Sequence, residues 1–161
     1  MSSFLVPAGE NGCTAWSAPH VADNGIAVQA SINTDTGNLI LDGDYDNSST
    51  EDSRAGIVVS ETTTISAKLQ LVLDATNNGI VPAGAATFEA GSGVLINDHL
   101  DGTGGLLVIN SDYESAGDGT LTVVATKRIR STNSPILVTS WDMDIAGDID
   151  AGICWMPALC D

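Results

Sequence analysis

The feature that most constrains the fold is a strict alternation of apolar and polar residues over short segments. In 26–33, Ile26, Val28 and Ile32 share one parity, while polar side chains hold much of the other. The same pattern runs through three further segments, 65–74, 120–130 and 136–145. A period of two is that of a β-strand with one buried face. Shorter apolar runs predict further strands at 38–41, 55–60, 85–89, 93–97, 105–110 and 152–156.

Dipeptides that favour tight turns separate these runs. They are Asn24-Gly25, Asp42-Gly43, Asn78-Gly79, Asp101-Gly102 and Asp118-Gly119. Asn-Gly and Asp-Gly adopt the left-handed backbone of two-residue hairpins, so each turn predicts an antiparallel pair. No helical period and no internal repeat of fixed length is apparent. We therefore expect a single all-β domain of 161 residues, an antiparallel β-sandwich of the jelly-roll kind.

The two ends of the chain differ from this pattern. Residues 1–24 carry no alternation and are interrupted by Pro and Gly, which predicts an extended N-terminal arm followed by a domain over 25–161. The C-terminal tail is apolar and contains Trp155, Met156 and Leu159. Such a tail packs against something, either this domain or another subunit.

The charge of the chain excludes several partners. Five basic residues stand against 21 acidic ones, which gives a net charge of −16. This charge opposes binding to nucleic acid or to an anionic membrane surface. No apolar run reaches the ~20 residues of a membrane span, and no signal peptide is visible. Cys13, Cys154 and Cys160 leave open three buried thiols or one disulfide with a free thiol.

One acidic segment has the spacing of a calcium loop. Asp42, Asp44 and Asp46 stand at alternate positions, so their carboxylates could converge on one hard cation. The match to an EF-hand loop is partial, because Asn47 stands where Gly is expected and Ser53 where Glu is expected. Calcium is thus the only cofactor suggested, and a solvated acidic loop is the alternative.

Two further charged clusters suggest an interface. Four carboxylates share one parity near the C-terminus: Asp142, Asp144, Asp148 and Asp150. Three of the five cations, Lys127, Arg128 and Arg130, lie within four residues. The basic cluster is expected to meet the acidic strip of the same chain or of a neighbour, or else to be a solvated strand end.

The sequence gives little sign of catalysis. Asp35-Thr36-Gly37 matches the aspartic-protease triplet, but a turn between two strands explains it fully. His20 and His99 are the only imidazoles, and the motifs of hydrolases, zinc proteases and nucleotide binders are missing. We expect a protein that is not an enzyme.

Three kinds of feature recur along the chain: the N-terminal arm Ser2–Asn24, the expected Gly/Ala/Thr-rich hairpins Gly79–Asn97 and Gly117–Thr126, and the apolar tail Ile153–Leu159. In style these features resemble the decoration, or cement, proteins on the heads of tailed bacteriophages. The resemblance implies a structural virion protein, assembled in the host cytoplasm, that braces a capsid as a homotrimer. The implied partners are the major capsid protein and copies of the chain itself, with Lys127, Arg128, Arg130, Trp155, Met156 and Leu159 as interface residues.

Two other functions stay open at this point. An extracellular β-sandwich that binds carbohydrate or calcium would explain the acidic loop and Tyr45. An acidic inhibitor that mimics DNA would explain the net charge, although Ser and Thr dilute its carboxylates.

Overall fold

The structure is a computed structural model, and it describes residues 4–6, 13–14, 19–47, 56–114 and 117–152. Within these ranges every regular element is a β-strand. The described residues form no helix long and apolar enough to cross a membrane.

The strands form three sheets, and every pairing within them is parallel. Sheet A contains β1 (Phe4–Val6), β4 (Ile26–Val28), β7 (Ile57–Val59), β10 (Ile80–Pro82), β13 (Leu100–Gly102), β16 (Arg128–Ser131) and β19 (Asp148–Asp150). Sheet B contains β2 (Cys13–Thr14), β5 (Ile32–Asn33), β8 (Thr63–Ala67), β11 (Ala86–Ala90), β14 (Leu107–Asn110) and β17 (Ile136–Thr139). Sheet C contains β3 (Pro19–Val21), β6 (Leu39–Asp42), β9 (Gln70–Asp74), β12 (Gly93–Ile96), β15 (Thr120–Val123) and β18 (Asp142–Ile145).

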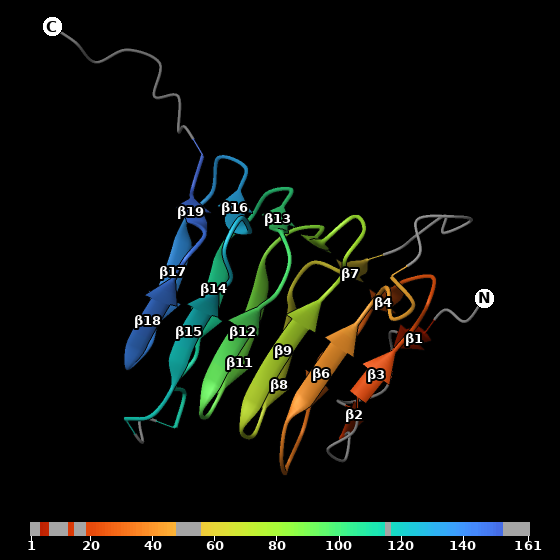
Figure 1. The fold of residues 1–161 in the computed structure, drawn as a ribbon, viewed down its shortest axis with the longest axis horizontal. Helices are drawn as coiled ribbons and strands as arrows, with labels where there is room; N and C mark the ends of the chain where they lie inside the picture. The colour runs from red at the N-terminus through yellow and green to blue at the C-terminus, as the bar shows by residue number, and fades with distance from the viewer. Residues whose placement is uncertain (1–3, 7–12, 15–18, 48–55, 115–116, 153–161) are drawn as a thin grey trace, which may run out of the picture.

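This strand order defines a parallel β-helix. The chain visits sheets A, B and C in turn, and each strand pairs with the third strand before it and the third strand after it. Three strands and three corners make one coil, and the coils stack from the red N-terminal end to the blue C-terminal end (Figure 1). Each coil therefore contacts chiefly the coils beside it.

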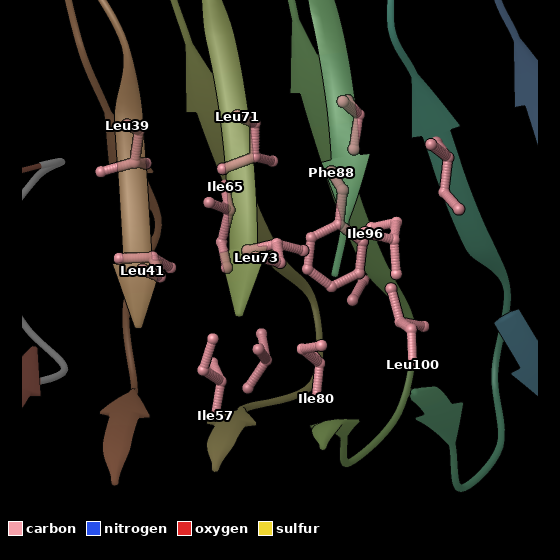
Figure 2. Close-up of a cluster of buried hydrophobic side chains, with 14 of the residues drawn as sticks. Leu39, Leu41, Ile57, Ile65, Leu71, Leu73, Ile80, Phe88, Ile96 and Leu100 are labelled. Carbon is pink, nitrogen blue, oxygen red and sulfur yellow. The ribbon is translucent and has the colours of Figure 1, made fainter. Parts of the chain in front are cut away.

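The core runs through the centre of the stack as columns of apolar side chains. In sheet B, register places Phe88 between Ile65 and Ile109, and all three side chains are fully buried. In sheet C, Leu71 lies in register with both Leu39 and Val94. Figure 2 shows Leu39, Ile65, Leu71 and Phe88 pointing from neighbouring coils into one shared interior.

The expected antiparallel β-sandwich is wrong, although the all-β class is right. The strands lie close to where alternation placed them, but 26–33, 65–74, 120–130 and 136–145 each bend at a corner and supply two strands to different sheets. One face of every β-helix strand is buried and the other faces outward, so alternation is the same as in an antiparallel sandwich. The pattern therefore cannot distinguish the two pairings.

The turn dipeptides also serve a different purpose from the one expected. Asn78 and Gly79 both have positive φ, of 62° and 64°, and they turn the chain from β9 in sheet C to β10 in sheet A. At this pair the turn chemistry is as expected, but it makes a corner of a coil instead of a hairpin. The left-handed backbone expected of the Asp-Gly pairs is wrong, because Gly43, Gly102 and Gly119 do not have positive φ, and Asp101-Gly102 lies within β13.

A repeat is present, but its length varies. One column of sheet A contains Ile26, Ile57, Ile80, Leu100, Ile129 and Ile149, so successive coils span 31, 23, 20, 29 and 20 residues. This variation in coil length hides the repeat from a search for a fixed period.

The boundary between an arm over 1–24 and a domain over 25–161 stays a prediction. Three short strands within the first segment, β1, β2 and β3, pair in parallel with β4, β5 and β6.

Candidate functional site

Polar side chains gather at the corner where the chain passes from sheet C to sheet A. We call Asp42, Asp44, Asp74, Asn77 and Asn97 the acidic corner. Asp42 and Asp74 are register partners at the ends of β6 and β9. The Nδ2 atom of Asn77 donates to Oδ2 of Asp44 at 2.6 Å, and that of Asn97 donates to Oδ2 of Asp74 at 3.1 Å. These bonds each join neighbouring coils.

The carboxylates of the acidic corner are not simply solvated. Asp44 is fully buried, and Asp42 is half-buried and accepts a hydrogen bond from the backbone N–H of Asp44 at 3.2 Å. Burial is the main cause that raises the pKa of Asp42, and the negative charges of Asp74 and Asp44 raise it further. The backbone hydrogen bond opposes this shift.

The three carboxylates of the expected calcium loop have different surroundings. Asp46 is exposed, whereas Asp44 bonds the next coil. Among residues 4–6, 13–14, 19–47, 56–114 and 117–152, no three His, Cys, Asp or Glu side chains are grouped so that they could hold a metal ion. Calcium binding at Asp42, Asp44 and Asp46 stays a prediction.

The basic cluster is divided among three carboxylates. Lys127 Nζ lies 3.1 Å from Oδ2 of the buried Asp98. Arg128 donates from Nε and one terminal nitrogen to the two oxygens of Asp101, at 2.8 Å each. Arg130 approaches the third carboxylate, that of Asp150 in β19.

The acidic strip and the basic cluster meet within this chain, as one of the two expectations proposed. Strand β16 pairs in register with β19, which puts Arg128 beside Asp148 and Arg130 beside Asp150. Arg130 Nε lies 3.7 Å from Oδ2 of Asp150, and both side chains are exposed. Asp142 and Asp144 lie on β18 and face outward beside Thr120 and Thr122 of β15.

The last described coil is a site that the sequence reasoning missed. We call β17, β18 and β19 the open coil, because each is the terminal strand of its sheet within the described part of the chain. Figure 1 shows these blue strands together at one end of the stack. Met143 and Ile149 occupy core columns, yet they are 53% and 38% exposed. Leu137 and Trp141 are 54% and 66% exposed.

Alternation in the sequence indicated that Met143 faces the core. Only the stacking order shows that its coil is the last one described. The open coil therefore presents an apolar cross-section together with three strand edges. Trp155, Met156 and Leu159, which the sequence suggests as interface residues, lie outside the described residues.

The remaining motif residues are placed apart. The triplet Asp35-Thr36-Gly37 forms a corner between β5 and β6, and its carboxylate accepts a hydrogen bond from Asn33 at 3.2 Å. His20 is in β3, where burial lowers its pKa. His99 precedes β13, and its buried Nδ1 atom has no hydrogen-bond partner among the residues that the structure describes.

Comparison with protein-family models, with curated proteins and with solved structures finds no match to this chain.

Proposed function

We propose that the chain is a non-enzymatic structural protein of a virion, which decorates and stabilises a phage capsid through subunit contacts. Its partners are the major capsid protein and copies of itself, as a homotrimer. The observation that supports a role in assembly is the open coil, where Met143 and Ile149 are exposed although they continue core columns. Leu137 of β17 and Trp141, between β17 and β18, are also exposed. Exposed apolar surface of this kind marks contact sites between proteins.

The rest of the stack is suited to a structural role. Its coils share one continuous apolar interior, and hydrogen bonds and ion pairs at the acidic corner and the basic cluster join neighbouring coils. Parallel strand pairing also links each coil to the next, so stability is shared between neighbouring coils.

The test is association with a large particle. Lysate of the source organism is sedimented on a sucrose gradient, and the protein is detected with an antibody. The proposal expects the protein in a fraction of megadalton size that also contains a capsid protein. Recovery of the protein only at its own mass, in lysates that contain intact particles, would contradict it.

A matched pair of variants tests whether the open coil makes the contact. Met143→Asp places a charge on this coil, whereas Leu69→Asp places one on an apolar side chain that is 46% exposed elsewhere. Loss of particle association in the first variant and retention in the second supports the assignment. Equal loss in both would count against it.

A second function, binding of carbohydrate outside the cell, is favoured by two exposed aromatic rings. Tyr45 and Trp141 are 59% and 66% exposed, and such rings can stack on sugars. A glycan array tests it, with Tyr45→Ala and Trp141→Ala as variants. Binding lost in either variant would favour this function over the virion role.

A further inference from the structure

We propose that the open coil binds a basic β-strand of another protein, which adds in parallel to β18 as the first strand of a further layer. Arg or Lys of the partner lies beside Asp142 and Asp144, and its apolar residues cover Met143 and Ile145. The inference rests on the proposed structural role and names the chemistry of the partner that the open coil takes.

The chain itself contains the template for this pairing. Strand β16 begins Arg128-Ile129-Arg130, and β19 reads Asp148-Ile149-Asp150. The two triplets pair in parallel register, with each Arg beside an Asp and with Ile129 beside Ile149. Opposite charges directly across neighbouring strands stabilise the pair, and like charges destabilise it.

Strand β18 repeats the acidic triplet, and no described strand pairs with its outer edge. It begins Asp142-Met143-Asp144, and its inner neighbour β15 offers Thr120 and Thr122 beside the two carboxylates. In the described part of the chain, no Lys or Arg nitrogen lies within 4.0 Å of either carboxylate. A basic strand on the outer edge would supply cations to β18, as Arg130 of β16 does to Asp150 of β19.

The occupant is a different protein rather than a second copy. The basic strand of this chain, β16, is already paired on both edges, with β13 and with β19. Two copies meeting through their open coils would bring Asp142, Asp144 and Asp148 of each together. The net charge of −16 on each copy adds further repulsion. Addition of a strand to a sheet edge is an established mode of peptide recognition.

The probe is a capped, fluorescein-labelled peptide with the core Arg-Ile-Arg-Ile, titrated with the full chain at low salt and followed by fluorescence anisotropy. Two control peptides carry Glu-Ile-Glu-Ile, which reverses the charge, and Arg-Arg-Ile-Ile, which keeps the composition and removes the alternation. Binding of the first peptide alone is expected. A shift of the ¹³C-methyl signal of Met143 on binding locates the peptide.

Charge reversal on β18 tests the register. The double variant Asp142→Lys and Asp144→Lys should bind the Arg peptide about tenfold more weakly and should gain binding of the Glu peptide. That gain also shows that the variant is folded. Asp35→Lys with Glu61→Lys changes the net charge equally at exposed positions elsewhere and should leave the affinity unchanged.

Several outcomes would overturn the inference. They are equal binding of all three peptides, equal effects of the two double variants, or an unmoved Met143 signal. If the wild-type chain sediments as a dimer and the double variant Asp142→Lys and Asp144→Lys does not, the occupant is a second copy. Particle association without binding of the Arg peptide would leave the virion role standing and refute only this partner, whereas the reverse result would refute only the virion role.

Discussion

Replacement of Phe88 by Ala removes the largest side chain of the buried core. Phe88 is fully buried, and the register of sheet B places it between Ile65 of the preceding coil and Ile109 of the following one. Figure 2 shows its ring in the shared interior beside Ile96. The coil that contains Phe88 is fixed by the coils on either side, so the cavity left by Ala cannot close unless both neighbouring coils move.

The expected loss is large for a domain of this size. Truncation of a buried Phe to Ala costs about 3–5 kcal/mol, against a usual total stability of about 5–15 kcal/mol. Phe88→Leu keeps most of the volume and should cost about 1.5 kcal/mol or less. Leu69→Ala, at a side chain that is 46% exposed, should cost about 0.5 kcal/mol or less.

Urea unfolding gives these differences, and amide hydrogen exchange gives their location. Because each coil contacts chiefly its neighbours, faster exchange in Phe88→Ala should centre on β8, β11 and β14 and fade toward both ends. A cost below about 1 kcal/mol, or faster exchange confined to β11, would refute the stacked core.

Three other substitutions test the polar groups. Ser131→Ala should raise the free energy of unfolding by about 1 kcal/mol, because the Ser131 hydroxyl is buried without a hydrogen-bond partner among the described residues. Lys127→Met should lower it by about 1–3 kcal/mol, because it leaves the carboxylate of Asp98 buried without its cation. Asp42→Asn should stabilise the protein at pH 7 and lose this advantage near pH 3. Burial raises the pKa of Asp42 above its ordinary 3.8, so the folded state loses stability as pH rises through that raised pKa. The neutral Asn avoids this loss.

Each of these results has its own control, read from thermal and urea unfolding. Arg130→Met removes an exposed ion pair and should cost less than about 1 kcal/mol, so an equal cost for Lys127→Met would contradict the role of burial. A destabilised Ser131→Ala protein would show that the hydroxyl has a partner. A benefit of Asp42→Asn that persists unchanged at pH 3 would exclude ionisation as its cause.

The sequence predicted where the strands lie but not how they pair. Alternation in 65–74 located β8, and the short apolar runs 85–89 and 93–97 located β11 and β12, each to within a few residues. Their partners lie one coil away, and the number of residues in a coil is set by loops at the corners that carry no periodic signal. The longest interval between register partners in the sheet A column, the 31 residues from Ile26 to Ile57, includes the polar segment 42–53.

The candidate sites were predictable to different degrees. Charge suggested that the basic cluster meets the acidic strip, and one cation does so, since Arg130 pairs with Asp150. The other two pair with carboxylates outside the strip, which charge alone did not indicate. The bond from Asn77 to Asp44 joins residues 33 positions apart and depends on the coil length, so no local pattern indicates it. The open coil is a property of stacking order, and Met143 resembles any other core residue in the sequence.

Interstrand nuclear Overhauser effects in the isotopically labelled protein test the central claim, the parallel β-helix, most directly. The backbone amide and α protons of Phe88 should show contacts with Ile65 and its neighbours on one side and with Ile109 and its neighbours on the other, in the parallel pattern. Antiparallel contacts between β11 and β12 across Gly91 and Ser92 would show a hairpin at this position and contradict the coiled fold.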